Sequence, residues 1–516
     1  MGVPWVFLVM FIRQKKNKSG STSVQIISKH GGKYKVEKTI GIASTQEQIS
    51  ILIHQAGYEI EKRQQQMSLF VSVADTQIEG YLQTLQNAQV RTIGPELIFG
   101  SIYDAIGFNA IREDLFRHLV IARLAFPLSK LKTTDYLFRY QGICIEVDRV
   151  YRFLDKLNDT LKEQVQQIAY QHTLHILKGK ISIVFYDMTT LYFEASDEDD
   201  LRKTGFSKDG KHHLPQIYLG LLVGLGGYAV GYDIFEGSIY EGDTLIPTID
   251  KLSKKFNLSK PIIVADAGLL SNDNISLLAK NGYHYIIGAR PKSESASIKK
   301  KILSDQLKDG QTKVITKPDG NKLILSYSIK RAAKDEHNRK RGLQRLEKQI
   351  RSGKLTKSNI NNKGYNKYLR MKGEVSIEID YEKFNQDKQW DGLKGYITNT
   401  ALKPAIILEQ YKNLWHIEKA FRMSKTDLRI RPIYHRLQKR IEAHICLSFT
   451  AYAIYKELER ILKQEKSSLS LKKAAELTHT MYQLQIILPD SKKQQAINLK
   501  MDEQQAELWK IIRKNY

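Results

Sequence analysis

Cysteine is scarce in this chain, whose 516 residues include two, Cys144 and Cys446. Two cysteines cannot build the disulfide framework of a small secreted protein, so we expect packed thiols in a reducing cytoplasm. No apolar run approaches the roughly 18 residues that cross a bilayer, which excludes a membrane-spanning protein. The opening MGVPWVFLVMF lacks a basic leader and a small-residue cleavage site, so we interpret residues 1–9 as an upstream-start extension before Met10.

Acidic residues are outnumbered by basic ones. There are 81 Lys and Arg against 55 Asp and Glu, a net charge of +26, with a sequence pI of about 9.6. This balance favours a nucleic-acid partner. Histidine arrays with zinc spacing are also missing, because His212 and His213 are adjacent and His435 and His444 are nine residues apart. The sequence therefore disfavours a zinc site.

Two short apolar runs each end in an aspartate. The run in ISIVFYDMTTLYFE ends at Asp187, and the run in PIIVADAGLLS ends at Asp266. β-Branched and aromatic residues over this length predict buried strands, and ligands collect at the carboxyl ends of strands in α/β sheets. One such Asp is more often the cap of the next turn or helix. Two of them, followed by a helical glutamate, favour a three-carboxylate metal site.

The glutamate lies in YKNLWHIEKAFRMSK, which has helical spacing. Steps of three or four residues put six side chains on one helical face, namely Tyr411, Trp415, Glu418, Arg422, Lys425 and Arg429. An apolar stripe beside them would pack the helix on a core, formed by Leu414, Ile417, Phe421 and Leu428. One carboxylate among aromatics and cations suits a metal ligand whose neighbours hold phosphates. The alternative is a surface helix with ordinary i,i+4 charge pairs.

Three carboxylates suit hard divalent cations, since Mg²⁺ takes oxygen ligands and keeps positions for water and phosphate oxygens. Two such ions roughly 3.5–4 Å apart can activate the attacking oxygen and stabilise the leaving one in phosphodiester displacement. We expect Asp187 to bridge the two ions, with Asp266 and Glu418 completing one each.

The order and flanks of these acids resemble a DDE transposase of a bacterial insertion sequence. The group it resembles, the YREK-signature (insertion-sequence-4-like) group, has Tyr, two residues, Arg, three residues, Glu, six residues and Lys. Tyr411, Glu418 and Lys425 occupy three of these places, and Leu414 stands in the Arg place. Arg422, one turn beyond Glu418, is our candidate substitute. Five more segments resemble the family and extend the resemblance over roughly residues 12–450: GFSKDGKHHLPQIYLGLLV, FEGSIYEGDTL, RLAFPLSKLKTTDYL, KRAAKDEHNRKRGLQRLEK and WDGLKGYITNT.

The resemblance implies an α/β catalytic core that is RNase H-like, a mixed sheet flanked by helices. It further implies a mostly helical N-terminal region, an inserted α+β subdomain and a helical C-terminus. The implied activity is cut-and-paste transposition with two Mg²⁺ ions, or Mn²⁺ as a substitute, on Asp187, Asp266 and Glu418. The implied partners are double-stranded DNA (the terminal inverted repeats and the target) and further copies of the chain, in a homodimer or higher synaptic assembly. No membrane is involved, and the expected location is the bacterial cytoplasm, at the nucleoid.

Ten residues are predicted to contact DNA. They are Tyr411, Trp415, Arg422, Lys425, Arg429, Trp390, Lys208, Arg339, Lys340 and Arg341. Trp390 and Trp415 are candidates for stacking an extruded base, although packing is the commoner role of a tryptophan. Two other functions stay open: a structure-selective nuclease on the same fold, and a DNA-binding protein derived from a transposase that has lost catalysis.

Six regions are predicted along the chain. The 151 residues between Asp266 and Glu418 are too many for a simple connection, so a subdomain must be inserted there. From Lys330 to Lys372 its net charge is +12, which fits either a solvated helical pair or a surface that follows a DNA backbone. The regions are 1–44 (basic β-hairpin), 45–178 (helical, DNA-binding), 179–292 (core, first part), 293–400 (inserted basic α+β subdomain), 401–450 (core, second part) and 451–516 (helical).

Overall fold

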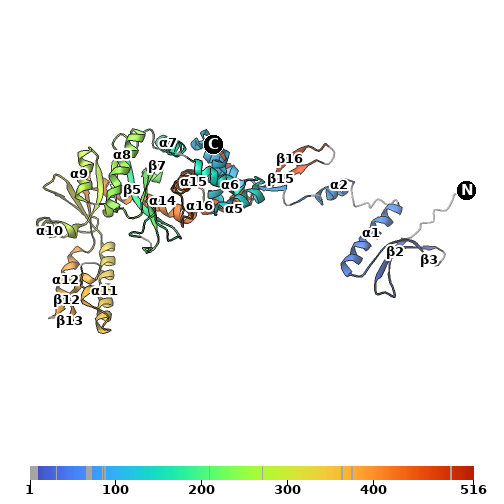
Figure 1. Cartoon of the computed structure of the whole chain (residues 1–516), viewed down its shortest axis with the longest axis horizontal. Coiled ribbons are helices and arrows are strands. Elements are labelled where there is room, and N and C mark those ends of the chain that lie inside the picture. Colours follow the sequence, from blue (N-terminus) through green and yellow to red (C-terminus); the bar gives the residue numbers. More distant parts are fainter. Residues whose placement is uncertain are drawn as a thin grey trace. The chain divides into compact units, whose positions relative to one another are not determined.

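The computed structural model divides the chain into two compact units (Figure 1). One unit is residues 1–89 with 485–495, and the other is residues 90–484 with 496–516. The predicted start extension, residues 1–9, and the predicted DNA contact Lys208 lie outside the described residues. The structure describes residues 10–30, 32–64, 73–83, 85–86, 89–157, 159–207, 210–269, 271–361, 364–372, 376–488 and 491–516.

Helices and strands alternate along most of the described chain. The strands are β1 (Met10–Lys16), β2 (Thr22–His30), β3 (Lys33–Ala43), β4 (Val90–Thr92), β5 (Ile183–Tyr192), β6 (Gln216–Gly224), β7 (Ala229–Glu236), β8 (Ile262–Ala265), β9 (Tyr285–Ala289), β10 (Thr312–Thr316), β11 (Lys322–Tyr327), β12 (Leu369–Lys372), β13 (Ser376–Ile379), β14 (Leu393–Thr398), β15 (Tyr482–Ile487) and β16 (Gln494–Asn498). The α-helices are α1 (Gln46–Gln64), α2 (Val73–Leu82), α3 (Ser101–Ile106), α4 (Asp114–Ala125), α5 (Lys130–Tyr136), α6 (Val147–Lys156), α7 (Asp159–Ile176), α8 (Leu245–Phe256), α9 (Asn272–Lys280), α10 (Ala296–Leu303), α11 (Ile329–Arg351), α12 (Tyr381–Gln386), α13 (Pro404–Lys412), α14 (Trp415–Arg422), α15 (Gln438–Gln464), α16 (Leu471–Thr478) and α17 (Glu503–Asn515).

The N-terminal unit contains a three-stranded antiparallel sheet, with strand order β1-β2-β3. The predicted hairpin corresponds to β2 and β3, and β1 adds a third strand. Val24 and Ile26 alternate along β2 and are fully buried, and they form a small core with Ala56 of α1. The helix therefore covers the face of the sheet to which Val24 and Ile26 point.

The larger unit is built on an eight-stranded mixed sheet, with strand order β10-β11-β14-β9-β8-β5-β6-β7. β5, β8 and β9 are parallel, and the other pairings are antiparallel. Both faces of the sheet are covered, because one large core cluster packs against each face. Phe185 belongs to the cluster shared with α4, α14 and α15, whereas Tyr186 belongs to the cluster shared with α8, α9 and α10.

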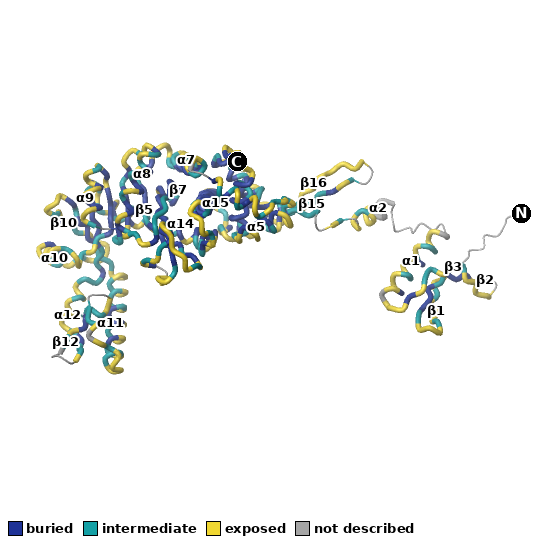
Figure 2. Tube along the Cα trace, viewed as in Figure 1, coloured by how far each residue is buried: buried dark blue, intermediate teal, exposed yellow. Residues whose placement is uncertain are grey.

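α15 is the central helix of this unit. It is buried from Ala443 to Leu462 except at Arg460, as Figure 2 shows by colour. A helix that is buried on all sides belongs to a core rather than to a surface. The apolar residues of α15 therefore belong to the core of the larger unit.

The predicted insertion, residues 293–400, is smaller in the structure than in the sequence interpretation. β10, β11 and β14 fall within that span, yet they continue the main sheet beyond β9. The backbone groups of β9 would otherwise lack partners on that side, and β14 satisfies them. The separate lobe is formed by α11, β12, β13 and α12, around a small core of Leu346, Tyr368, Leu369 and Ile379.

Two further expectations differ from the structure. The C-terminal region was predicted to be helical, but β15 and β16 form a three-stranded sheet with β4, in which Leu484 pairs with Val90. Of the two cysteines, Cys446 is buried, whereas Cys144 is exposed and is not packed as predicted. In the described part of the chain, no helix has both the length and the hydropathy that a bilayer span requires.

Candidate active site

The two aspartates lie side by side on neighbouring parallel strands. In the β5–β8 register Tyr186 pairs with Ala265, so Asp187 and Asp266 occupy the next step, where adjacent strands are roughly 4.8 Å apart. Side chains alternate along a strand, and Phe185 and Val264 both point into the cluster under α14 and α15. Asp187 and Asp266 therefore face the same side of the sheet. The carboxylate of Asp187 accepts a hydrogen bond from its neighbour Met188 N at 2.8 Å.

The helix with Glu418 covers this same face of the sheet. As predicted, the apolar stripe is buried: Ile417 is fully buried, and Leu414 and Phe421 are each 7% exposed. Glu418 and Arg422, each one position after a residue of this stripe, are exposed on the flank of α14. The helix thus packs by its apolar side and keeps its charged side accessible.

The long continuous helix predicted for residues 411–429 is wrong at both ends. A turn at Asn413 and Leu414 separates α13 from α14, with a tightened bond from His416 N to Asn413 O at 2.9 Å, so Tyr411 leaves the exposed face and is buried. At the other end a π-helical turn, η12 (Met423–Asp427), precedes Arg429, which has a left-handed backbone (φ 47°). Ile430 N donates to Ser424 O at 3.0 Å, the cap that a left-handed residue allows. Arg429 therefore lies beyond the helix.

Tyr411 contacts the second aspartate directly. Its hydroxyl donates to Asp266 Oδ1 at 2.8 Å. Burial, and then Asp266, raise the pKa of Tyr411 far above its ordinary value, so the phenol keeps its proton and remains a donor. Gly288 leaves room for this contact, since a Cβ there would lie 2.4 Å from Tyr411 Oη.

Lys394 of β14 is a cation at the same place. Its Nζ lies 4.4 Å from the centre of the Tyr411 ring. Burial and Arg331 lower the pKa of Lys394, while Asp266 and Glu418 raise it, so both carboxylates act on this one ammonium group. Asp266, Glu418, Tyr411 and Lys394 therefore form one electrostatic cluster.

The three acids are not gathered into a finished metal site. Among the residues that the structure describes, no three His, Cys, Asp or Glu side chains are placed to hold one ion together. The donor set itself suits a hard cation, because all three groups are carboxylates and carboxylate oxygens are what Mg²⁺ prefers. The assignment of Asp187, Asp266 and Glu418 as metal ligands remains a prediction.

A buried carboxylate stabilises the contact between α14 and α15. Glu459 is 5% exposed and accepts hydrogen bonds from Lys419 of α14 and Lys456 of its own helix. Burial alone would raise the pKa of Glu459, but these ammonium groups outweigh burial and lower it to about 2. His416 lies beside this network, and its burial, with Lys456 next in importance, lowers the pKa of His416 to about 4.

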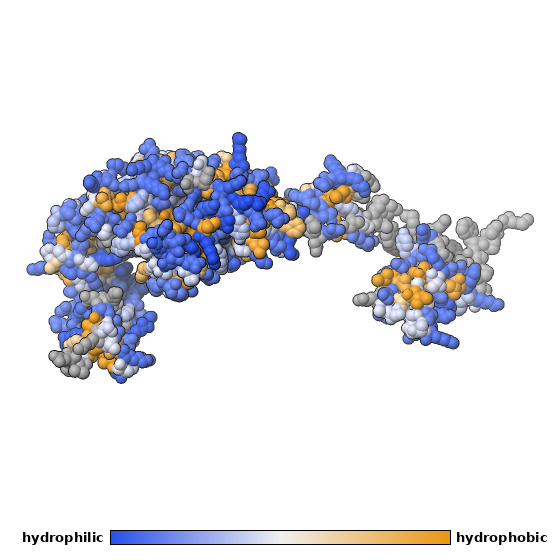
Figure 3. Space-filling view, viewed as in Figure 1, coloured by the Kyte–Doolittle hydropathy of each residue, from blue (hydrophilic) through white to orange (hydrophobic). Residues whose placement is uncertain are grey.

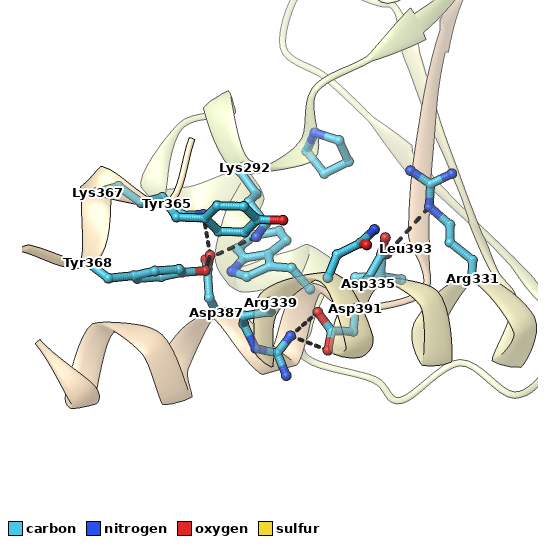
Figure 4. Close-up of a pocket in the computed structure, with 13 residues that line it drawn as sticks. Lys292, Arg331, Asp335, Arg339, Tyr365, Lys367, Tyr368, Asp387, Asp391 and Leu393 are labelled. Carbon is cyan, nitrogen blue, oxygen red and sulfur yellow. Dashed lines mark hydrogen bonds and ion pairs between the residues drawn. The ribbon is translucent and has the colours of Figure 1, made fainter. Parts of the chain in front are cut away.

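The predicted DNA contacts in the insertion divide into buried and exposed groups. Arg339 is 7% exposed and forms an ion pair with Asp391, as Figure 4 shows, so it does not face solvent as predicted. Lys340 and Arg341 are exposed on α11. Trp390 is partly buried and lines a cavity of about 330 Å³ that also includes Arg339.

The remaining aromatic and basic candidates lie on α14 and the turn that follows it. Trp415 is 45% exposed, and Lys419 Nζ lies 5.8 Å from the centre of its ring. Lys425 is half-buried in η12. Figure 3 shows that hydrophilic residues cover most of the face in view, as the high charge content leads one to expect.

Two residues near the site were missed by the sequence interpretation. Lys394 stands in the strand LKGYIT, and a lone charge in an apolar strand is a signal that could have found it. Glu241 lies beside Gly268, two residues after the second aspartate, since a Cβ on Gly268 would be 3.7 Å from Glu241 Oε2. Its segment, FEGSIYEGDTL, drew attention for its resemblance rather than for this acid.

Comparison with known proteins gives one family. The family described as "Transposase DDE domain" matches residues 178–454, just over half of the 516 residues. Among solved structures, a piggyBac transposase in a synaptic complex with hairpin DNA is similar, with 10% sequence identity and a TM-score of 0.39. The similarity covers 75% of this chain and 78% of that chain, and a TM-score of 0.39 does not establish a common fold. No curated protein matches the chain.

Proposed function

The chain belongs to the family that carries the transposase DDE domain, and on that premise we propose that Asp187, Asp266 and Glu418 are its catalytic acids. It is a DNA transposase. The observation that carries the assignment of the site is the β5–β8 register, which puts Asp187 and Asp266 on one face of the sheet beneath the helix of Glu418. We further propose that the sheet order β7-β6-β5-β8-β9 is an RNase H-like core and that the chain belongs to the bacterial YREK-signature group.

The three carboxylates would hold two Mg²⁺ ions, with Mn²⁺ as a substitute. When bound, such ions supply charge neutralisation at the attacking and leaving oxygens of a phosphodiester displacement. The carboxylates of this chain fit that role because all three are oxygen donors, and Asp266 directly follows β8, at the carboxyl end of a strand, where ligands collect in α/β sheets.

The other residues of the site act by positioning. Tyr411 fixes one oxygen of Asp266 and leaves the second oxygen for a ligand. Lys394 offsets the charge of Asp266 and Glu418 and presents an ammonium group to a phosphate that enters between them. Catalysis of phosphoryl transfer rests mainly on such positioning and charge stabilisation.

The proposed reaction has two steps at this one site. Water cuts the strand at the element end and exposes a 3′-hydroxyl, and this hydroxyl then attacks target DNA in a transesterification. Arg422 and Lys425 lie on and directly after the helix of Glu418, where they can hold the scissile strand. Trp415, exposed on the same helix, is the better placed tryptophan for stacking an extruded base, since Trp390 is partly buried.

The proposed substrate is double-stranded DNA, as terminal inverted repeats and target. The net charge of +26 supports this, since phosphate contacts supply most of the affinity for DNA. Joining two ends calls for more than one copy of the chain, so we propose a homodimer or a higher synaptic assembly.

The test is a cleavage and strand-transfer assay on DNA with the element's own ends, with Mg²⁺ or Mn²⁺. We expect the wild-type chain to cut and join, Glu418→Ala and Asp187→Ala to bind the ends without cutting, and Lys425→Ala to lose part of both activities. Glu409→Ala, an exposed acid on the preceding helix α13, is the matched control and should cut normally. Normal cutting by Asp187→Ala would refute the site, and cutting of branched DNA without joining would point to a structure-selective nuclease.

A further inference from the structure

A second cavity lies behind the helix of Glu418, between α4, α5 and the connection to α15. Its volume is about 760 Å³, compared with about 330 Å³ for the cavity beside Trp390. None of its described lining residues is Asp or Glu. Six are basic: Arg123, Lys130, Arg429, Arg431, Arg436 and Arg440.

The two deepest cations have no carboxylate between them. Arg123 is 7% exposed and Lys130 is 6% exposed. Arg123 donates to the backbone oxygens of Leu428 and Arg429 at 3.4 and 3.5 Å. Burial, and next the repulsion of Arg123, lower the pKa of Lys130 well below its ordinary value. Without an anion, burial therefore favours the uncharged amine of Lys130, and a bound anion would favour its charged form, so this end of the cavity suits an anionic ligand.

The cavity near Trp390 shows the opposite arrangement. There Arg339 pairs with Asp391, and Asp387 accepts from Lys367 and lies 3.0 Å from Lys292 (Figure 4). Its charges are balanced within the protein. An excess of buried positive charge therefore distinguishes the cavity of Lys130 from an ordinary charged pocket.

The mouth of the cavity carries a different chemistry. Tyr434 is 72% exposed at its rim, and Leu437 is 49% exposed beside it. Arg440 is already occupied, because it donates two hydrogen bonds of 2.7 Å to Asp155. Exposed aromatic rings serve as stacking platforms for nucleic-acid bases. A phosphate site at the bottom of the cavity and a stacking site for a nucleic-acid base at its mouth together fit a nucleotide.

The connection that lines the cavity contacts the end of the strand that carries Asp187. Ile433 N donates to Tyr192 O at 3.1 Å, so the connection that lines the cavity runs beside the end of β5. Tyr192 comes five residues after Asp187, a separation of roughly 16 Å at about 3.3 Å per residue. A strand whose phosphate lies at Asp187 can therefore place a nucleotide a few positions away in this cavity.

We propose that this cavity binds a phosphate monoester at the 5′ end of a DNA strand, with the phosphate between Lys130 and Arg123 and the terminal base on Tyr434. A phosphate monoester carries a charge of about −1.5 to −2 at neutral pH, so it would favour the charged form of Lys130 beside Arg123 more strongly than the single charge of a phosphodiester. The identity of the strand as DNA rests on the proposed function, whereas the phosphate chemistry does not.

The test compares short single-stranded oligonucleotides with a 5′-phosphate and with a 5′-hydroxyl, bound to the full chain in EDTA and followed by fluorescence anisotropy. We expect the wild-type chain to bind the phosphorylated strand about tenfold more tightly, because charged hydrogen bonds are worth that much or more. Lys130→Met should abolish this preference. Lys132→Met, an exposed lysine on the same helix α5, should keep it.

The thermal stability of Lys130→Met separates binding from structure. Since the variant removes a buried amino group for which the described residues supply no carboxylate in the cavity, its Tm should not fall. A lower Tm with the preference intact would make Lys130 structural and overturn the proposal. Equal binding of the two strands by the wild-type chain would also overturn it.

Competitors identify the source of the phosphate. Tyr434→Ala should weaken the binding of the oligonucleotide and of a nucleoside 5′-monophosphate, but not the binding of inorganic phosphate. A mononucleotide that binds more tightly than the oligonucleotide would overturn the DNA end as ligand. Because the assay needs neither metal nor cleavage, a 5′-phosphate preference without cutting would refute the proposed catalytic site alone, and cutting without the preference would refute the cavity alone.

Discussion

The hydroxyl of Tyr411 connects the second aspartate to the helices that cover it. The substitution Tyr411→Phe removes this donor to Asp266 Oδ1 and keeps the ring that packs against Tyr396. A hydrogen bond to a charged group is worth about 1.5–3 kcal/mol, so we expect cleavage to slow by roughly tenfold or more. End binding should be unchanged. The measurement is single-turnover cleavage on element-end DNA.

Tyr396→Phe is the matched control, because it removes the hydroxyl of the neighbouring ring and leaves the contact with Asp266 in place. The centre of this ring lies 4.7 Å from that of Tyr411. Equal loss in both variants would mean that packing of the ring pair matters rather than the contact with Asp266.

Among elements, the pairing of α14 with α15 depends on Glu459. Glu459→Gln leaves Lys419 and Lys456 near each other without a carboxylate between them. Removing one partner of a buried ion pair typically costs about 3–5 kcal/mol, so the variant should unfold at a clearly lower temperature. Glu465→Gln, at the C-terminal end of the same helix but paired with the exposed Lys514, should change stability far less. Calorimetry of both variants measures their unfolding temperatures. Similarly small changes in the two variants would contradict a stabilising role of Glu459.

The same pair of helices predicts how stability depends on pH. His416 has a pKa of about 4 in the fold, against about 6.5 in an unfolded chain. Between these values the unfolded chain binds more protons, so stability falls as pH drops from about 6.5 to 4. Glu459, with a folded pKa of about 2, adds stability that is present above about 4.3 and is lost below it.

The check is Tm against pH from 7 down to 4, at constant ionic strength. His416→Gln should flatten the curve, whereas His337→Gln, an exposed histidine on α11, should leave its slope as it is. A wild-type Tm that does not change over this range would contradict the buried, neutral His416.

For the whole molecule, charge governs affinity for DNA. If Lys340 and Arg341 contact phosphates, their double replacement by Ala should reduce the slope of log Kobs against log[salt] by about 2, since each contact contributes roughly 0.9. Lys472→Ala with Lys473→Ala removes the same charge from the exposed side of α16 and serves as the control. An equal change in both pairs would show that net charge, rather than the surface of α11, sets the slope.

The sequence foretells local features of this chain well and distant pairings poorly. Asp266 could be placed because it directly follows a short apolar strand, and the burial of Ile417 could be read from helical spacing. Asp187 was expected at a strand end as well, but it lies in the middle of β5, which continues to Tyr192. The place of Lys394 beside Tyr411 could not be predicted, because β14 returns to the sheet after the whole lobe that begins at α11. Arg339 looked like a DNA contact because its partner Asp391 is 52 residues away in the sequence.

The ends of the helix around Glu418 could not be predicted from the sequence either. Nothing in the spacing of YKNLWHIEKAFRMSK marks the turn at Asn413, and Arg429 is a residue that seldom adopts a left-handed backbone. Both features arise from packing against the sheet and α4 rather than from local preference.

The distance along the chain between the acids has a consequence for synthesis. Asp187 and Asp266 lie on or directly after the central strands of the sheet, but 151 residues separate Asp266 from Glu418, which lies beyond the lobe of α11. A polypeptide that stops before α14 therefore has two of the three acids and lacks the buried helix α15. We expect such a fragment neither to complete the fold nor to cut DNA, so that unfinished products would not damage the genome.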